Sequence, residues 1–280
     1  MSWHSLFQAP PAHRHRYRVH LVGIGGTGLA PIANVLLDMG FQVSGSDMHS
    51  SPRTTWLDQL GASIMIGHDP RHLYQDKHPQ LPDVVLASSA VPAENPELVE
   101  ARRQGVPIIH RREFLGPLTR GRRVIAVAGT HGKTTTTAMI THILTKAGVE
   151  PGYIIGSEVP GLGISAAGIG PLFVIEADEY DYAFLGLSPA IAVLTSLDWD
   201  HPDCFPNRQS YEFAFRKFVR NLRPGGQVLY CRDDVGLRGL ATSLGDPEHW
   251  HSYGSRNGAG WKAGNIEITP KATRYTLYLP

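Results

Sequence analysis

The chain has 280 residues, of which 42% are hydrophobic and 18% are charged, and its formal net charge is +1. These values exclude wholesale disorder and leave no basic footprint for nucleic acid. No run of about 18 apolar residues is present and the N-terminus lacks the apolar core of a secretory signal, so we expect no membrane insertion. Two cysteines, Cys204 and Cys231, form no disulfide framework or thiolate metal site. We therefore expect a cytoplasmic protein of about two domains.

The first part of the chain alternates short apolar strands with helical patterns, which is typical of parallel α/β proteins. A loose tail over residues 1–16 precedes this pattern. We expect helices at residues 29–39, 54–60 and 96–104, and strands at residues 18–22, 41–47, 62–67, 83–90 and 106–110. Together these elements complete one doubly wound unit by about residue 118.

After a linker at residues 116–123 (GPLTRGRR), the strand and helix pattern starts again. We expect a helix at residues 133–147 with Met139, Ile143 and Leu144 facing inward, and another at residues 211–222. Strands are expected at residues 124–129, 173–178, 190–198 and 227–231, and short β segments follow from about residue 249. The fold class is therefore α/β, with two tandem doubly wound units.

A glycine loop follows the first strand of the second unit, in the segment VIAVAGTHGKTTTTAMI. Backbone N–H groups at such a helix start bind phosphate, and Lys133 and Thr134 supply a charge and a hydroxyl for Mg²⁺. The loop is a variant, because Val127 stands where the usual first glycine would be. The alternative is a glycine turn that only joins strand to helix, but a Lys-Thr pair at the helix start has little structural reason. The pattern predicts a nucleotide site.

Two later strands end in acidic clusters, EADEYD at residues 176–181 and DWDHPD at residues 198–203. Ligand sites in open α/β sheets lie at the carboxyl ends of strands, and hard oxygen ligands suit Mg²⁺. Glu176 is therefore a candidate Mg²⁺ ligand, with His201 as a second ligand or an orienting group. The alternative is that both clusters are solvated acidic loops.

An earlier glycine loop, residues 23–28, fits the pattern G-x-G-x-x-G, and Asp47 ends the following strand. Taken alone, this fingerprint predicts a dinucleotide enzyme such as an NAD-dependent oxidoreductase. A nucleotide-sugar diphosphate satisfies the same loop. Serines at residues 88–89, after a later strand, are expected either to line this site or to form a simple turn.

Taken together, these segments resemble the Mur ligases, the ATP-dependent amide-forming enzymes of peptidoglycan precursor synthesis. The resemblance is carried by HLVGIGGTGLAPIANVLLDMGFQVSGSD, ASSAVP, AGTHGKTTTT, EADEYD and DWDHPD, and it runs from about residue 17 to the end. It implies a Rossmann-like UDP-sugar-binding domain at residues 17–118 and a central P-loop ATPase-type domain at residues 119–280. It also implies that the C-terminal domain of the family is absent from the chain.

Within the family, the chain is most similar to the branch that joins L-alanine to the carboxylate of UDP-N-acetylmuramate in the bacterial cytoplasm. The resemblance implies ATP and Mg²⁺ as cofactors and an acyl phosphate that L-alanine attacks. Tyr180 stands where this branch commonly has serine, which favours a recycling ligase that attaches a tripeptide to the same sugar. Lys217 lies near a lysine that several members carbamoylate, but the alanine-adding branch does not rely on it. A third hypothesis is a non-catalytic nucleotide-binding fragment.

The resemblance also implies roles for single residues. Lys133, Glu176 and His201 would be catalytic, and Thr134, Glu176 and His201 would hold Mg²⁺. The expected ATP-binding residues are Gly129, Thr130, His131, Gly132, Lys133, Thr134 and Thr135. The expected UDP-sugar-binding residues are Gly23, Gly25, Gly26, Gly28, Asp47 and Ser89.

Overall fold

The computed structural model describes residues 3–74, 80–244 and 248–280. The chain forms two compact units, which are described separately. The first unit consists of Met1–Arg122 and Ile140–Phe173, and the second consists of Arg123–Met139 and Val174–Pro280. Because the first unit takes in a segment far along the chain, the expected domain ranges 17–118 and 119–280 stay predictions.

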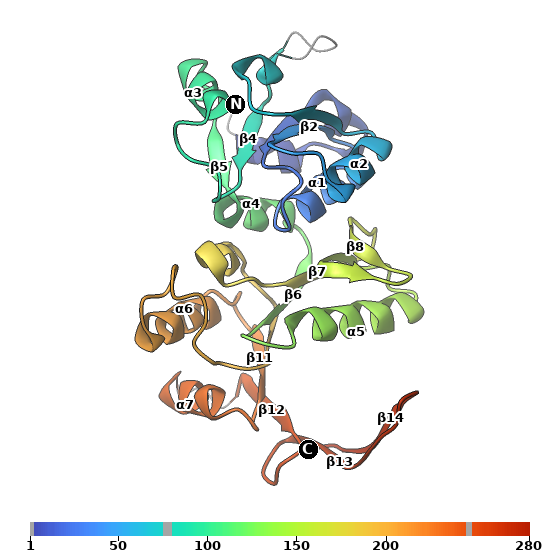
Figure 1. The fold of residues 1–280 in the computed structure, drawn as a ribbon. Helices are drawn as coiled ribbons and strands as arrows, with labels where there is room; N and C mark the ends of the chain where they lie inside the picture. Colours follow the sequence, from blue (N-terminus) through green and yellow to red (C-terminus); the bar gives the residue numbers. More distant parts are fainter. Residues whose placement is uncertain (1–2, 75–79, 245–247) are drawn as a thin grey trace. The chain divides into compact units, whose positions relative to one another are not determined.

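A parallel five-stranded sheet forms the core of the first unit, in the order β3-β2-β1-β4-β5 (Figure 1). Its strands are β1 (Arg18–Val22), β2 (Gln42–Asp47), β3 (Ser63–Ile66), β4 (Val84–Ala87) and β5 (Ile108–His110). The strand order reverses at β1. Right-handed crossovers therefore place α1 (Ala30–Asp38) and α2 (Pro52–Gln59) on one face and α3 (Pro96–Arg103) on the other. The first glycine loop follows β1 at this switch point, where open α/β sheets bind ligands.

Two expectations about the ends of this unit are wrong. Instead of a loose tail, residues 3–16 form short 3-10 helices at Trp3–Gln8 and Pro11–Arg16. The first of these buries Leu6 and Phe7, and the Phe7 ring packs edge-on against Phe114 with centroids 5.2 Å apart. The expected linker at residues 116–123 instead begins inside α4 (Arg111–Leu118) and ends at the first residue of β6 (Arg123–Ala128). The glycine, proline and charged residues of this segment indicated a linker, but Pro117 lies inside the last turn of α4.

Residues 140–173 contain an antiparallel hairpin that the sequence did not suggest. It consists of β7 (Gly152–Val159) and β8 (Gly163–Ala166). Inside the first unit, the buried Asn34 side chain donates hydrogen bonds to the Ser165 carbonyl at 2.8 Å and to Ser165 Oγ at 3.1 Å. Irregular pairing between Ile154 and Val159 breaks the alternation that would have indicated a strand.

The second sheet is mixed and has the order β14-β13-β12-β11-β10-β6-β9-β7-β8. Its remaining strands are β9 (Leu172–Glu176), β10 (Ile191–Leu194), β11 (Gln227–Cys231), β12 (Trp250–Gly254), β13 (Trp261–Ile268) and β14 (Thr273–Tyr278). β6 lies between β9 and β10, and it pairs with β10 in parallel. The second glycine loop and both acidic clusters follow these three neighbouring strands.

The helix after the second glycine loop, α5 (Lys133–Lys146), begins where expected but turns a different face inward. Met139 and Ile143 are 58% and 62% exposed, and Leu144 is half-buried, so the predicted apolar inner face is wrong. Thr137 and Thr141 are fully buried in its place. The methyl groups of Thr137 and Thr141 fit a buried face, but a hydrophobicity pattern does not count threonine as apolar.

Two more helices complete the second unit. In α6 (Arg208–Arg220), Tyr211, Ala214, Phe215 and Phe218 form one buried stripe. Asn207 caps this helix, since the Ser210 N–H donates to Asn207 Oδ1 at 2.8 Å. The sequence did not predict α7 (Val235–Leu244), whose only deeply buried side chains are Leu237 and Leu240. Figure 1 shows α6 and α7 beside the strands β11 and β12.

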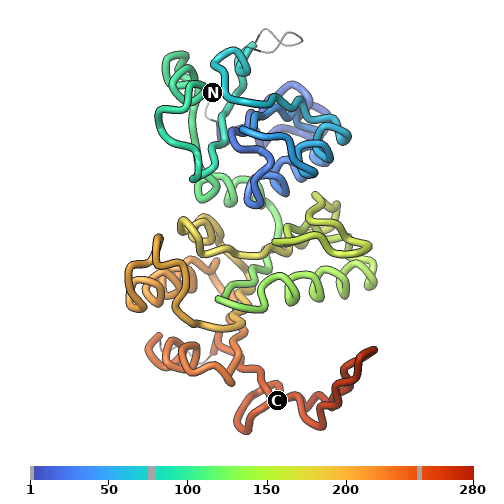
Figure 2. The backbone as a smooth tube through the Cα atoms, in the orientation of Figure 1, coloured from blue at the N-terminus to red at the C-terminus, as the bar shows by residue number. Residues whose placement is uncertain are grey.

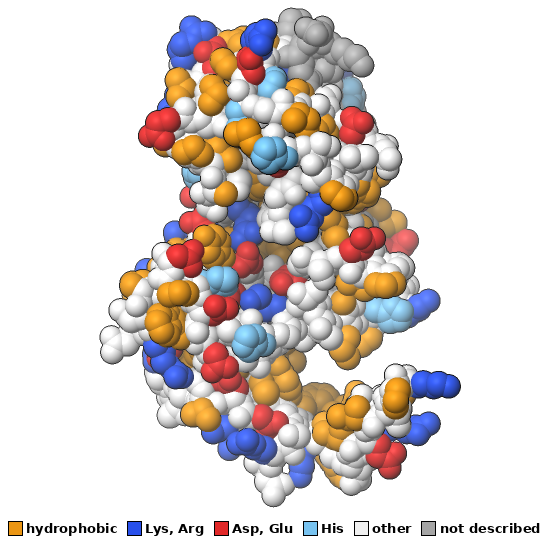
Figure 3. Space-filling view, viewed as in Figure 1, with side chains coloured by type: hydrophobic (Ala, Val, Ile, Leu, Met, Phe, Trp, Pro, Cys, Tyr) orange, Lys and Arg blue, Asp and Glu red, His pale blue; other side chains and the backbone are white. Residues whose placement is uncertain are grey.

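The last two strands, β13 and β14, form an antiparallel hairpin that extends from the rest of its unit (Figure 2). All six residues of β14 are exposed. Apolar side chains remain on the surface of this hairpin, as the orange groups at its end in Figure 3 show, and they include Ile268, Tyr275, Leu277 and Tyr278.

Candidate active site and nucleotide-binding loops

The second glycine loop is a tight turn between β6 and α5. Gly129 has φ of 140° and Gly132 has φ of 80°, and residues other than glycine rarely adopt such backbone angles. A Cβ on Gly129 would lie 2.1 Å from Thr195 Oγ1 and 2.8 Å from the Ser196 nitrogen. Only glycine fits here, and the first N–H groups of α5 stay open toward a ligand, as phosphate binding requires.

The side chain of Lys133 is held inside this loop. Its ammonium donates to the Gly129 carbonyl at 2.6 Å and to the Glu179 carboxylate at 3.0 Å. Lys133 is 13% exposed and Glu179 is fully buried. The loop therefore holds a largely desolvated positive charge close to the position that a bound phosphate would take.

The predicted Mg²⁺ ligands are only partly brought together. Thr134 Oγ1 donates to Glu176 Oε1 at 3.1 Å, so these two oxygens from α5 and the end of β9 are adjacent. His201 instead lies beside Glu179 and Asp200, with its Nε2 atom at 3.7 Å and 3.8 Å from their carboxylates. Its φ of 53° is strained for a non-glycine residue, which is typical of functional positions. Among the described residues, no group of three or more His, Cys, Asp or Glu side chains is arranged to hold a metal.

The remaining predicted loop residues divide into two kinds. Thr130 is anchored, since its hydroxyl donates to the Asp198 carbonyl at 2.6 Å and lies 3.1 Å from the Tyr211 hydroxyl. The His131 N–H donates to Ser196 Oγ at 2.9 Å. The loop is therefore attached to the segment after β10. Thr135, by contrast, is exposed on the first turn of α5.

Sequence reasoning missed Glu179 and Tyr211. The Tyr211 hydroxyl donates to Glu179 Oε1 at 3.0 Å, and both residues are fully buried. Burial, together with the neighbouring Glu179 carboxylate, raises the pKa of Tyr211 well above its ordinary value. Glu179 belongs to the acidic cluster that the sequence singled out, but nothing in that cluster distinguishes the inward carboxylate from its exposed neighbours. Tyr211 resembles any aromatic residue on the buried stripe of α6.

The first glycine loop uses a carboxylate in a different way. The N–H groups of Gly23 and Ile24 donate to the Ser46 carbonyl, and the Gly25 N–H donates to Asp47 Oδ2 at 2.9 Å. A Cβ on Gly25 would lie 2.8 Å from Thr54 Cγ2 and 3.0 Å from Asp47 Oδ2. Asp47 therefore lies against the loop, as the sequence suggested.

Arg111 and Ser88 also lie against the first loop; the sequence named Ser88 as a possible lining residue but did not single out Arg111 for binding. A Cβ on Gly28 would lie 2.4 Å from Arg111 Nη1, and one on Gly23 would lie 3.0 Å from Ser88 Cβ. Ser89, the predicted residue, is exposed in the turn that follows. Arg111 brings a positive charge to the helix start that follows Gly28, which suits an anionic diphosphate.

A buried polar cluster lies in the same unit, near the ends of β2 and β3. The fully buried carboxylate of Glu97 accepts hydrogen bonds from His20 Nε2 at 2.7 Å and from His68 Nδ1 at 2.9 Å. Burial acts to raise the pKa of Glu97, but the hydrogen bond and charge interaction with His20, together with hydrogen bonds from Ser46 and His68, outweigh it and lower that pKa to about 2. Burial lowers the pKa of His20, although the hydrogen bond to the Glu97 carboxylate acts to raise it. The cluster ties β1, the loop after β3 and α3 together.

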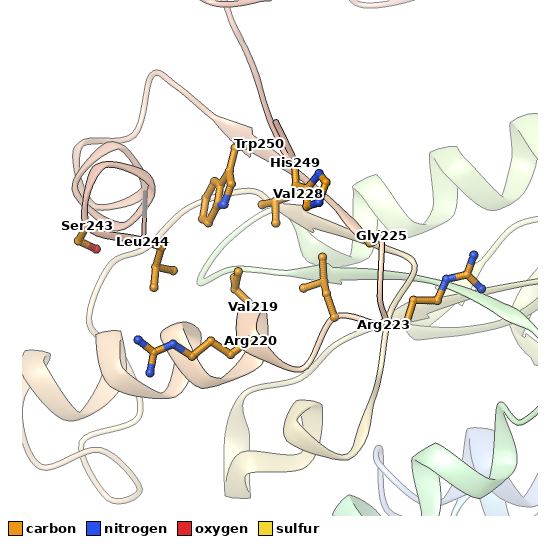
Figure 4. Close-up of a pocket in the computed structure, with 11 residues that line it drawn as sticks. Val219, Arg220, Arg223, Gly225, Val228, Ser243, Leu244, His249 and Trp250 are labelled. Carbon is orange, nitrogen blue, oxygen red and sulfur yellow. The ribbon is translucent and has the colours of Figure 1, made fainter. Parts of the chain in front are cut away.

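A separate cavity of about 330 Å³ lies between α6, α7, β11 and β12 (Figure 4). Gly225, Gly226 and His249 line it, so it lies at the amino ends of β11 and β12. Both glycine loops follow the carboxyl ends of strands. This cavity is therefore not part of the candidate active site.

Two glycine loops follow the carboxyl ends of strands in two α/β sheets, and the second contains a largely buried lysine, as in proteins with phosphate-binding loops. A model of the Mur ligase family catalytic domain matches residues 18–123, and a model of the Mur ligase middle domain matches residues 127–279. The chain therefore belongs to the Mur ligase family.

Two curated relatives carry the same name. The UDP-N-acetylmuramate–L-alanine ligase of Frankia casuarinae is 48% identical over 228 residues, which cover 81% of this chain and 45% of that protein. The ligase of the same name from Roseiflexus castenholzii is 41% identical over 273 residues, covering 92% of this chain and 55% of that protein. The chain thus spans about half the length of the curated relatives it matches.

Two solved structures of ligases that use UDP-N-acetylmuramate have a similar fold. A UDP-N-acetylmuramate:L-alanyl-gamma-D-glutamyl-meso-diaminopimelate ligase from Neisseria meningitides has a TM-score of 0.82 at 28% identity, covering 94% of this chain and 84% of that chain. A UDP-N-acetylmuramate–alanine ligase from Thermotoga maritima has a TM-score of 0.78 at 31% identity, covering 93% of this chain and 57% of that chain. The predicted fold class is confirmed by these likenesses. Within the described residues, no helix is long and apolar enough to span a bilayer.

Proposed function

We propose that the chain carries the UDP-sugar and ATP sites of a ligase that joins L-alanine to the carboxylate of UDP-N-acetylmuramate. The observation that carries this proposal is the pair of glycine loops, one per sheet, of which only the second holds a lysine. The names of the similar proteins support the choice of substrates. Because the reaction consumes ATP, we place it in the bacterial cytoplasm.

In the proposed reaction, the sugar carboxylate attacks the γ-phosphorus of ATP, and ADP leaves. The amine of L-alanine then attacks the acyl phosphate, inorganic phosphate leaves and the amine gives up a proton. The backbone N–H groups at the start of α5 bind the phosphates, and Lys133 contacts the β- and γ-phosphates. Since phosphoryl transfer depends on positioning and charge neutralisation, a desolvated lysine in a rigid loop supplies what the first step needs.

Mg²⁺ fits the residues at the start of α5. Thr134 and Glu176 present two hard oxygens 3.1 Å apart, and Mg²⁺ commonly takes one or two protein carboxylates together with phosphate oxygens. When bound, the ion would neutralise charge on the phosphates. We propose that Thr134 and Glu176 hold it and that His201, in the segment after β10, contributes to the same site.

The first loop is proposed to bind the UDP part of the sugar nucleotide. Gly23, Gly25, Gly26 and Gly28 let the backbone approach the diphosphate, and Asp47 lies where a ribose hydroxyl is commonly bound in such folds. The guanidinium of Arg111 against Gly28 adds the positive charge that this loop otherwise lacks. Ser89 keeps a proposed role at the rim of the site.

A tripeptide in place of L-alanine is the second candidate substrate. Tyr180 supports it, because its hydroxyl donates to Asp203 at 2.9 Å and its ring packs edge-on against His201. The structure with the TM-score of 0.82 also bears a name that includes a peptide. An oxidoreductase finds no support, because the whole of the first loop falls within a Mur ligase model.

The ligand-binding part of this proposal can be tested on these 280 residues. Calorimetric titration should show one site for UDP-N-acetylmuramate and one for the non-hydrolysable ATP analogue AMP-PNP, while NADH should not bind. Binding of NADH without binding of the UDP-sugar would overturn the proposal. Release of inorganic phosphate that depends on L-alanine would identify the amino substrate, whereas dependence on the tripeptide would favour the recycling reaction.

A further inference from the structure

Glu179 is a fully buried carboxylate at the centre of the second loop. It lies just after β9, at the start of the 3-10 segment Tyr180–Gly186. Asp181 and Tyr182, which follow it, both adopt left-handed backbone angles, with φ of 53° and 55°. Such strain persists only where the surrounding structure imposes it, and it is concentrated at functional sites. The backbone at this point is therefore constrained, while Glu179 itself faces inward.

The hydrogens of the Lys133 ammonium are all engaged. The ammonium has three donors. The ammonium donates to the Gly129 carbonyl at 2.6 Å. It also donates to the two carboxylate oxygens of Glu179, at 3.0 Å and 3.2 Å. The Thr130 carbonyl lies at the longer distance of 3.4 Å. To contact a phosphate, Lys133 must give up at least one of these partners.

Glu179 is the partner that a phosphate would displace. The Gly129 carbonyl belongs to the rigid loop and bears no net charge, whereas the carboxylate repels an incoming phosphate at close range in a poorly solvated site. A buried carboxylate left without a donor would be costly, but the Tyr211 hydroxyl also donates to Glu179, at 3.0 Å. Glu179 can therefore release Lys133 and still keep a hydrogen-bond donor.

We propose that Glu179 is a positioning residue that holds Lys133 in the loop and hands it to the phosphates of the nucleotide. This inference rests on the proposed ATP site. Tyr211 stabilises the released carboxylate. Because Tyr211 also lies 3.1 Å from Thr130 Oγ1, the exchange involves a residue that already touches the loop.

The exchange predicts opposite effects from two substitutions. Glu179→Gln removes the competing charge but keeps an oxygen that can accept from Lys133 and Tyr211, so AMP-PNP should bind about tenfold more tightly. Tyr211→Phe removes the donor that stabilises the released carboxylate, so AMP-PNP should bind about tenfold more weakly. AMP lacks the β- and γ-phosphates, and its affinity should change by less than about twofold in both variants.

The experiment is calorimetric titration of the 280-residue chain with AMP-PNP and with AMP. Glu212→Gln is the matched control for loss of a carboxylate charge. Glu212 lies on α6, the helix that contains Tyr211, and it pairs with Arg208 on the surface. Tyr253→Phe is the control for a lost tyrosine hydroxyl, since the partly buried Tyr253 donates to the Leu194 carbonyl outside the loop. Neither control should change either affinity.

Several results would overturn the inference. If wild-type chain binds AMP-PNP but Glu179→Gln binds it equally or more weakly, the exchange is wrong and the proposed function is unaffected. If Glu179→Gln does not fold, as judged by thermal unfolding, Tyr211→Phe decides alone, and an unchanged or tighter affinity for AMP-PNP overturns the exchange. Failure of the wild-type chain to bind AMP-PNP would overturn both this inference and the proposed function.

Discussion

The two glycine loops have the same position between a strand and a helix, but different groups of each loop bond to its carboxylate. Each joins the carboxyl end of a strand to a helix, and in each a carboxylate accepts a hydrogen bond from the loop. In the first loop, Asp47 accepts from the backbone N–H of Gly25, at 2.9 Å. In the second, Glu179 accepts from the side chain of Lys133, at 3.0 Å. In the proposed function, the first loop binds a diphosphate that does not react, and the second neutralises a phosphate that is transferred.

The largest effect should come from the lysine that only the second loop holds. Lys133→Ala removes the charge that contacts the outer phosphates, so AMP-PNP affinity should fall by about 100-fold or more. UDP-N-acetylmuramate affinity should stay within about twofold. Lys146→Ala, at the exposed end of the same helix, is the control. If Lys133→Ala weakens both ligands equally, the two loops do not act as separate sites, and the comparison fails.

A second prediction concerns how tightly the second loop is packed. Gly129→Ala would place a Cβ 2.1 Å from Thr195 Oγ1, so we expect the free energy of unfolding to fall by about 2–4 kcal/mol. Gly225→Ala, which also has positive φ but meets open space, should cost about 1 kcal/mol. Urea unfolding of the two variants measures the difference. Equal losses would mean that only backbone strain, and not contact with the segment after β10, fixes the loop.

The first loop should respond to its own carboxylate. Asp47→Ala removes the acceptor of the Gly25 N–H and the proposed ribose contact, so UDP-N-acetylmuramate should bind about tenfold more weakly. AMP-PNP binding should not change. The control Asp58→Ala lies on the exposed surface of α2. Titration calorimetry checks both ligands, and an unchanged affinity for the UDP-sugar would remove Asp47 from the site.

The smallest effect is a pH dependence confined to the first unit. Burial lowers the pKa of His20 below its unfolded value near 6.5, so His20 stabilises the fold above that pH and loses this contribution as pH falls toward its folded pKa. Glu97, with a pKa of about 2, contributes above its unfolded value near 4.3 and loses its contribution only as pH falls toward 2. Arg18 and His72 also act on His20, and both oppose its protonation.

Urea unfolding between pH 7 and pH 5 tests this sign. Stability of the wild-type chain should decrease as pH falls, because the unfolded state binds a proton that the buried His20 does not. His20→Gln should reduce this slope. A slope that is the same in both chains would show that other groups account for it.

The sequence predicts the parts of the molecule in which local patterns and chemistry coincide. Strands with glycines at their ends, such as β1 and β6, are identified together with the helices that follow, because one short segment contains both signals. The hairpin β7–β8 escapes because its pairing is irregular. α4 escapes because Pro117 inside the helix indicates a linker. The inner face of α5 is buried by threonines, which a hydrophobic pattern ignores.

The residues of the candidate site also divide into those that a local motif predicts and those that only the fold brings together. Lys133, Thr134 and Asp47 are predictable because a motif places each at a fixed distance from a glycine loop. Glu179 and Tyr211 are not, since 32 residues separate them in the chain and only the fold brings the hydroxyl to the carboxylate. Their contact is a tertiary one, and neither residue belongs to a pattern that spans both.

The most direct test of two separate nucleotide sites uses the wild-type chain and both ligands together. The chain is first saturated with UDP-N-acetylmuramate and then titrated with AMP-PNP in a calorimeter. We expect one further equivalent of AMP-PNP to bind while the UDP-sugar is retained. Displacement of the UDP-sugar by AMP-PNP, or loss of AMP-PNP binding in its presence, would contradict it.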